Sequence, residues 1–178
     1  MKLICLPRAI VLSCSLVLAG HLFLPIVDPV EAESVAGEQP ASESVVRLRR
    51  AILGQESGGK FDAVNPHSGA LGYAQLMPAN VKAWGQEAVG YAPSKQEFLS
   101  KPELQLQIID HKLGQYWQEE LQTAGGDEQT AVMRVASRWY SGNANLYTST
   151  RKQYTKGHEY PSIASYSNSI WLKYQGAK

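Results

Sequence analysis

The carboxyl group of Glu56 lies at a spacing that could place it among apolar side chains. Val45, Leu48 and Ile52 follow the three- and four-residue steps of a helix face, and four more residues lead to Glu56. Burial disfavours the charged form of a carboxyl group and raises its pKa toward neutrality. Such a group can act as a general acid, for example toward a glycosidic oxygen. The spacing fits equally a glutamate just beyond the helix that points into water, so it leaves both interpretations open.

A polar stretch rich in glycine follows Glu56 and predicts a loop. Gly58-Gly59 would end the helix, and residues 60–73 contain many Gly, Asn, Pro and Ser residues. Asp62 is the only other acidic residue between Glu56 and Gln86. The stretch therefore offers one carboxyl group on a helix end and one in a loop, where Asp62 is most simply a turn residue.

Groups for other kinds of chemistry are scarce. Both cysteines, Cys5 and Cys14, lie near the start of the chain, and the four histidines show no ligand spacing. We therefore expect no disulfide framework, no metal site and no cofactor. The formal net charge of +1 gives no reason to expect binding to nucleic acid.

Composition divides the chain into three parts. Residues 1–32 have a basic start, an apolar run and small residues at Val30-Glu31-Ala32, which predicts a signal peptide for export to the periplasm or the cell exterior. An uncleaved membrane anchor is the alternative. Residues 33–44 are polar and acidic and predict a flexible linker. Residues 45–178 would then form one domain, since 178 residues with 44% hydrophobic content suffice for one core but hardly for two.

The expected domain is mainly α, with a small loop or hairpin region near residues 61–73. Ser44 is the expected N-cap of a helix over 45–56, and Pro78 opens a second helix to about residue 88. Ser94-x-x-Glu97 predicts the start of a short helix, and residues 103–123 a long one. Asp127 and Gly142 bound a further helix with Trp139 inward. A polar loop over 143–160 follows, and Pro161 opens the last helix.

Three short motifs carry a resemblance to a known family. Glu56-Ser57, Ser68-Gly69-Ala70-x-Gly72 and Gln75-Leu76-Met77-Pro78 stand in one order within about thirty residues. They resemble the Glu-Ser and Gly-Ala-x-Gly-Leu-Met-Gln-x-Met-Pro motifs of lytic transglycosylases, the soluble enzymes related to goose-type lysozyme in glycoside hydrolase family 23. Downstream, residues 139–143 and 160–166 are similar to the segments that carry the tyrosines of that family.

The resemblance implies a lysozyme-like α+β fold and a defined reaction. Such enzymes cleave the β-1,4 bond between N-acetylmuramic acid and N-acetylglucosamine in peptidoglycan glycan strands. By this match Glu56 is the single acid/base, and the muramic 6-hydroxyl closes a 1,6-anhydro ring without consuming water. Peptidoglycan is then the expected partner, and we expect a monomer associated with the cell envelope.

The same resemblance suggests roles for other residues around the cleft. Gln75, Tyr140 and Tyr166 match substrate-contacting positions, with Tyr166 able to hydrogen-bond Glu56, although both tyrosines also fit plain core positions. Other expected substrate contacts and supports are Asn65, Ser68 and Tyr73, and Ser57, Gly69, Gly72 and Ser141. Asn65 and the glycines fit ordinary turns equally well. The family pattern breaks at Tyr73-Ala74, which replaces Leu-Met, and at Ser141, which replaces asparagine.

Two alternative functions remain open on the sequence. A goose-type lysozyme-like hydrolase would use Asp62 to position a water molecule. A non-catalytic wall-binding protein would keep the cleft without activity, although a degenerate enzyme commonly loses a costly buried acid such as Glu56 first.

Overall fold

Helices dominate the part of the chain that the computed structural model describes, residues 41–155 and 157–177. In chain order the elements are α1 (Glu43–Glu56), α2 (Pro78–Val89), α3 (Lys95–Ser100), α4 (Pro102–Thr123), α5 (Glu128–Ser141), the 3₁₀ turn η1 (Ala144–Leu146), β1 (Gln153–Thr155), β2 (His158–Tyr160) and α6 (Ile163–Gly176). The mainly α class predicted from the sequence is confirmed. No helix within these ranges is long and apolar enough to cross a membrane.

The predicted signal peptide, 1–32, and most of the predicted linker, 33–44, lie outside the described residues. The first helix begins at Glu43, two residues before the predicted domain start. Its N-cap is Ser42, whose side chain accepts a hydrogen bond from the backbone N–H of Val45, so the prediction of Ser44 as cap was wrong. Ser44 instead lies within the first turn.

Local capping signals place most of the other helix ends where the sequence predicted them. The side chains of Ser94 and Asp127 accept hydrogen bonds from the backbone N–H groups of Glu97 and Thr130. Pro78 occupies the first turn of α2, and Gly142 ends α5 in the left-handed conformation with φ of 77°. These ends depend on neighbouring residues, which is why they can be read from sequence.

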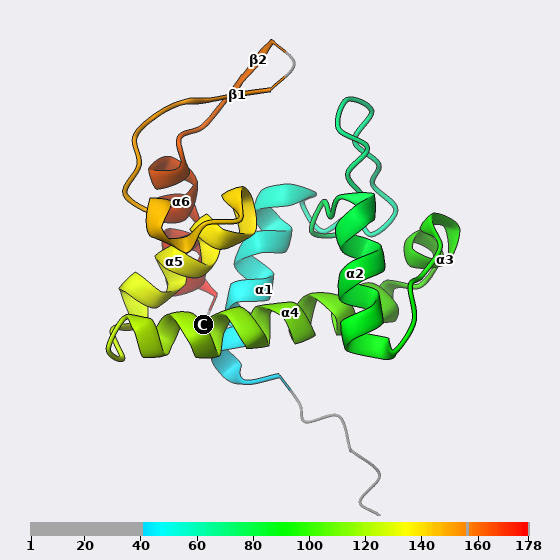
Figure 1. The fold of residues 1–178 in the computed structure, drawn as a ribbon, viewed down its shortest axis with the longest axis horizontal. Coiled ribbons are helices and arrows are strands. Elements are labelled where there is room, and N and C mark those ends of the chain that lie inside the picture. Colours follow the sequence, from blue (N-terminus) through cyan, green and yellow to red (C-terminus); the bar gives the residue numbers. More distant parts are fainter. Residues whose placement is uncertain (1–40, 156, 178) are drawn as a thin grey trace, which may run out of the picture. The chain divides into compact units, whose positions relative to one another are not determined.

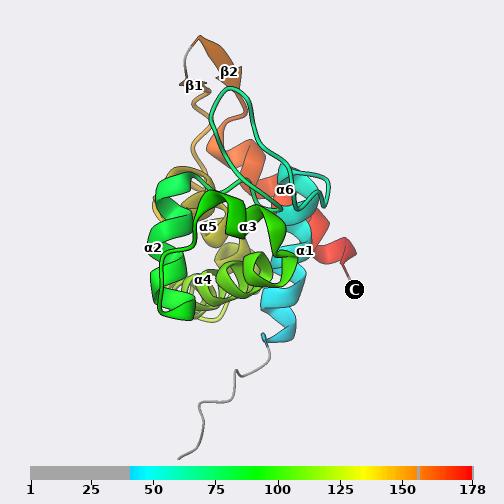
Figure 2. The same ribbon diagram turned by 90° about the vertical axis from the view of Figure 1, so that its right-hand side faces the viewer.

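The predicted loop or hairpin region is a loop, and the hairpin lies elsewhere. Residues 61–73 hold only isolated bridges, which pair Leu71 with Val64 and with Leu76. The antiparallel hairpin is formed instead by β1 and β2, with Tyr154 opposite Glu159, inside the segment predicted as a polar loop. Figures 1 and 2 show this hairpin and the loop between α1 and α2 projecting on the same side of the helices.

Helix α1 packs against both α4 and α6 (Figure 1). Its apolar stripe, Val45, Leu48 and Ile52, is fully or nearly fully buried. Arg49 on α1 pairs with Asp110 on α4. On the α6 side, the Arg47 guanidinium lies 3.9 Å from the centre of the Tyr174 ring. The orientation of α1, and hence of its last residue, is therefore fixed from two sides.

Gln105 on α4 anchors the loop that follows α1. Its side chain is fully buried, with 0% exposure. Its Oε1 accepts a hydrogen bond from the Tyr73 N–H at 2.9 Å, and its Nε2 donates to the carbonyls of Phe61 and Phe98 at 2.8 Å each. A Cβ at Gly72 would lie 2.2 Å from the same Oε1, so this close approach requires glycine. One polar side chain thus holds both ends of the loop 61–73.

We expect Gln105→Leu to lower the free energy of unfolding by about 2–4 kcal/mol, because three backbone groups lose a buried partner. Urea unfolding followed by circular dichroism measures the change. Gln118→Leu, at an exposed position on the same helix, is the matched control and should change stability by less than about 0.5 kcal/mol. An equal effect of the two substitutions would contradict the anchoring role.

Candidate active site

Glu56 is the last residue of α1 and its side chain is partly buried. Burial raises the pKa of this carboxyl group above its usual 4.5, and a hydrogen bond from Tyr166 acts in the opposite direction. The Tyr166 hydroxyl donates to Oε1 of Glu56 at 2.5 Å. The group is therefore biased toward its protonated form, yet it has a donor that stabilises it when it is ionised.

Two stacked tyrosines from different helices hold this arrangement. Tyr166, in the first turns of α6, stacks on Tyr140, near the end of α5, with ring centres 4.4 Å apart and planes 12° from parallel. The Tyr140 hydroxyl donates to the carbonyl of Pro161 at 3.2 Å. Burial and the nearby charge of Glu56 raise the pKa of Tyr166 well above its usual value. Tyr166 consequently remains a neutral hydrogen-bond donor.

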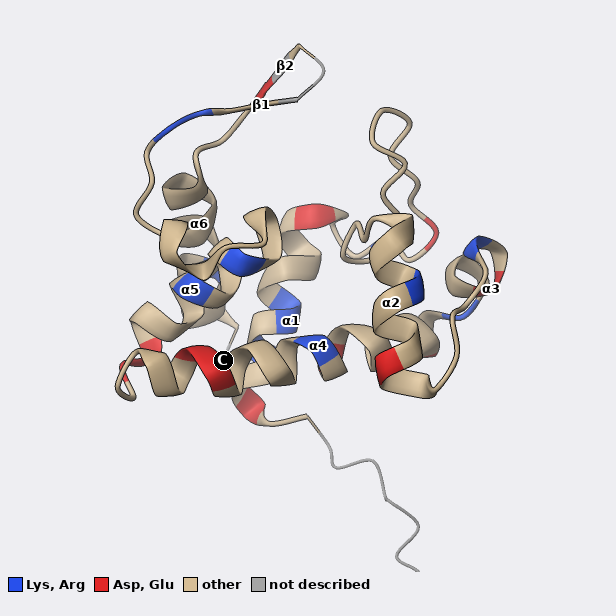
Figure 3. Cartoon of the chain, viewed as in Figure 1, with Lys and Arg blue, Asp and Glu red and all other residues tan. Residues whose placement is uncertain are grey.

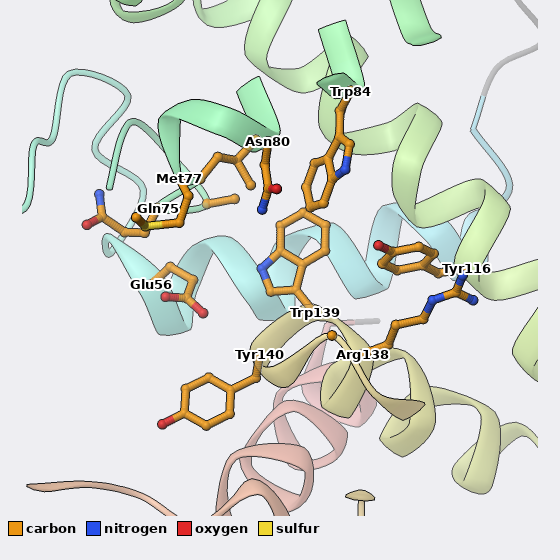
Figure 4. Close-up of a pocket in the computed structure, with 12 residues that line it drawn as sticks. Glu56, Gln75, Met77, Asn80, Trp84, Tyr116, Arg138, Trp139 and Tyr140 are labelled. Carbon is orange, nitrogen blue, oxygen red and sulfur yellow. The ribbon is translucent and has the colours of Figure 1, made fainter. Parts of the chain in front are cut away.

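A pocket of about 400 Å³ opens beside Glu56 (Figure 4). Its wall comes from the end of α1, from residues 74–77 and from α2, α4 and α5. In Figure 4 the indole of Trp139 lies between Glu56 and a group formed by Trp84, Tyr116 and Arg138. Glu56 is the only Asp or Glu among the residues of the described chain that line this pocket.

Aromatic rings make up the far half of the pocket. The Trp84 and Trp139 ring centres are 5.3 Å apart, and Tyr116 meets Trp84 edge-on at 6.4 Å. The Arg138 guanidinium covers the Tyr116 ring at 4.0 Å and pairs with Glu119 and Glu120, so its charge is balanced within the protein. Rigid aromatic faces with a few polar groups are typical of sites that hold a small organic ring.

Gln75 lines the pocket and has an unusual backbone. Its φ is +48°, and it is the only non-glycine residue with positive φ in the described ranges. Its side-chain amide donates to the Gly72 carbonyl at 3.1 Å, which ties it to the turn before it. Backbone strain at a pocket wall is commonly retained where a side chain must be presented in one orientation.

Several predicted substrate contacts lie elsewhere. Oδ1 of Asn65 accepts hydrogen bonds from the backbone N–H groups of His67 and Ser68, and Oγ of Ser68 accepts one from Ala70. Both side chains thus build the turn, and neither is among the residues that line the pocket. The Tyr73 ring packs against Phe61 at 6.1 Å and is likewise not among them. Their contact with substrate stays a prediction.

The predicted supporting residues brace backbone. Oγ of Ser57 accepts hydrogen bonds from the N–H groups of Gly59 and Lys60, just after the end of α1. Oγ of Ser141 donates to the Ser137 carbonyl at 2.7 Å. Gly69 has φ of +78° and open space around it, whereas Gly72 makes its close approach to Gln105. Asp62 is exposed and is not among the residues that line the pocket. The described residues contain no group of side chains that could hold a metal ion.

Sequence reasoning missed the aromatic part of the pocket. Trp139 was expected in the core, but it is half-buried and lines the pocket. Asn80 and Trp84, four residues apart on α2, both line the same pocket, and Tyr116 of α4 lines it as well. The spacing of Asn80 and Trp84 was a usable signal, because residues four apart share a helix face.

Substitution of Glu56 by glutamine should stabilise the fold at high pH. Because burial raises the folded-state pKa of Glu56, the folded protein binds this proton more tightly than the unfolded chain does. Wild-type stability should therefore fall as pH rises from the unfolded pKa through the folded one, whereas Glu56→Gln lacks this loss. Thermal unfolding at pH 4 and pH 8 tests this, with pH 4, where both side chains are neutral, as the internal control. A variant that is less stable than wild type at pH 8 would contradict it.

Comparison with known proteins agrees with this geometry. The model of the transglycosylase SLT domain family matches residues 34–133, more than half of the chain. A search of curated proteins and a search of solved structures returned no match. The family match and the mainly α architecture bear out the predicted lysozyme-like class. The chain belongs to the transglycosylase SLT domain family, the lytic transglycosylases that act on peptidoglycan.

Proposed function

We propose that this protein is an exported lytic transglycosylase with Glu56 as its single acid/base, producing 1,6-anhydromuramic ends. The observation that carries the proposal is the partly buried carboxyl group of Glu56, with its raised pKa and its hydrogen bond from Tyr166, at the edge of an aromatic pocket. Export rests on the predicted signal at residues 1–32, and the domain limits of 45–178 rest likewise on composition.

The reaction uses one carboxyl group twice, first as an acid and then as a base. Protonated Glu56 gives its proton to the oxygen that leaves with N-acetylglucosamine, while the N-acetyl group of the muramic residue stabilises the anomeric carbon. The Glu56 carboxylate then takes the proton of the muramic 6-hydroxyl as that oxygen bonds to the anomeric carbon. Glu56 ends protonated, and no water is consumed.

Each half of this cycle needs a different charge on Glu56. Burial favours the protonated form that the first step requires. The hydrogen bond from Tyr166 favours the carboxylate that forms next, and the raised pKa of Tyr166 keeps its hydroxyl protonated throughout. Burial thus favours one form of Glu56 and the hydrogen bond from Tyr166 favours the other, which suits a group that must act as acid and as base.

The single carboxyl group also supports a transglycosylase over a two-carboxylate glycosidase. Retaining enzymes place a second carboxylate roughly 5 Å from the first, and inverting enzymes place it farther away to hold water. Among the described residues that line the pocket, Glu56 has no such partner, and Asp62 lies on the exposed loop. A sugar ring next to Glu56 would pack on Trp139 and then on Trp84.

Product analysis tests the proposal. Purified protein is incubated with cell-wall sacculi, and the released fragments are analysed by mass spectrometry. We expect 1,6-anhydro muropeptides from wild type, nearly unchanged release by Asp62→Asn, and a loss of at least about a hundredfold with Glu56→Gln. Fragments with reducing ends, together with a strong loss in Asp62→Asn, would favour the lysozyme-like hydrolase instead. Equal binding of sacculi by wild type and Glu56→Gln without any release would favour a non-catalytic wall-binding protein.

Loss of the Tyr166 hydroxyl should move the pH dependence of cleavage. Tyr166→Phe removes the hydrogen bond that lowers the pKa of Glu56, so the pKa rises further. The alkaline limb of kcat/KM should shift to higher pH, with a lower maximum because the carboxylate loses its donor. The pH profile of dye release from labelled sacculi measures this. A shift of the alkaline limb to lower pH would contradict the assigned role of Tyr166.

A further inference from the structure

A second pocket, of about 580 Å³, lies beside the β1–β2 hairpin. On the hairpin side it is lined by Thr150, Lys152, Glu159 and Tyr160, and on the α6 side by Ser165 and Asn168. Figure 3 shows negative charge on β2 and positive charge on the segment that leads into β1. The proposed chemistry at Glu56 uses none of the residues that line this pocket.

A hydrogen bond between two lining residues connects the second pocket to the first. Pro161 lines the second pocket, and its carbonyl accepts the hydrogen bond from Tyr140, which lines the first. Tyr140 in turn stacks on Tyr166, the donor to Glu56. The Tyr140–Pro161 contact therefore lies between a sugar at Glu56 and the second pocket. A group attached to that sugar would reach the second pocket by passing this contact.

The lining of this pocket suits a charged peptide better than a neutral sugar. The Lys152 ammonium pairs with the Glu159 carboxylate at 2.6 Å, and both side chains are about half exposed, at 61% and 49%. An exposed pair of this kind contributes little stability, so either partner can exchange it for a group on a ligand. Ser165 and Asn168 are exposed on the facing helix and add polar groups that can bind backbone amides.

We propose that this pocket binds the short peptide attached to the muramic acid of the strand in the first pocket, through the free carboxylate and amine groups of that peptide. The inference rests on the proposed function, because it requires a peptidoglycan strand at Glu56. The attachment fixes the direction in which the peptide leaves the sugar. Lys152 then binds a carboxylate of the peptide, and Glu159 binds an amine of the peptide. The hairpin thereby selects strands that carry the peptide.

The ion pair between Lys152 and Glu159 could have a purely structural role, and suitable variants distinguish this role from peptide binding. Lys152 and Glu159 could serve only to hold the hairpin, together with the hydrogen bond from Tyr154 to Glu159. The exchanged double variant Lys152→Glu/Glu159→Lys keeps an ion pair across the hairpin but reverses the charges that a ligand meets. Arg151→Glu changes a neighbouring exposed cation that does not line the pocket and serves as the matched control.

The experiment compares cleavage of intact glycan strands with cleavage of strands whose peptides have been removed by an amidase. We expect wild type to show kcat/KM about fivefold higher on peptide-bearing strands, the size of one exposed charge contact. The exchanged variant should lose this preference for peptide-bearing strands while its kcat/KM on stripped strands stays unchanged. Arg151→Glu should keep the preference. Two results would overturn the proposal. One is equal kcat/KM of wild type on both kinds of strand, and the other is an exchanged variant that keeps the preference of wild type for peptide-bearing strands.

A binding measurement separates failure of this inference from failure of the proposed function. Calorimetry with Glu56→Gln compares a disaccharide tetrapeptide with the same disaccharide without peptide. Tighter binding of the peptide form, lost on exchange of Lys152 and Glu159, supports the pocket even if no strand is cleaved. Cleavage of both kinds of strand at equal rates, with equal binding of both disaccharides, leaves the proposed function intact and refutes the peptide pocket.

Discussion

The hydrogen bond from Tyr166 to Glu56 is the interaction on which the site depends. It joins residues 110 positions apart, so it forms only when α6 has docked on α1. The apolar stripe of α1 carries Glu56 to a partly buried position at the helix end, where ionisation is costly. Tyr166 compensates part of that cost without removing it. A stable fold and a reactive acid thus come from the same helix contact.

The contact also organises the surroundings of Glu56. Tyr140 stacks on Tyr166 because α5 ends at Gly142 beside the start of α6, and its hydroxyl reaches Pro161. Trp139, one residue earlier, faces the aromatic pocket. Two consecutive residues at the end of α5 therefore have different roles. Trp139 lines the pocket at Glu56, and Tyr140 makes the contact between that pocket and the hairpin side. Changes at this helix end should affect both.

Features set by nearby residues could be read from the sequence, and features set by distant contacts could not. The stripe from Val45 to Ile52 predicted the position of Glu56, and Asp127 and Gly142 predicted the bounds of α5, because helix periodicity and caps are local. The hairpin at residues 153–160 was missed because its short strands are polar and do not alternate. Gln105 was missed because a buried polar side chain is recognisable only by its partners. Trp139 was assigned to the core because helix spacing does not distinguish a core face from a pocket wall.

A direct titration of the Glu56 carboxyl group tests the central claim most sharply. Carbon-13 labelling of glutamate side chains and NMR spectra across pH, with Glu56→Gln to assign the signal, report its pKa in the folded protein. The account predicts a midpoint clearly above 4.5, since burial outweighs the hydrogen bond from Tyr166. A midpoint at or below 4.5 would show an ordinary ionised carboxylate at neutral pH and would contradict Glu56 as the acid of the reaction.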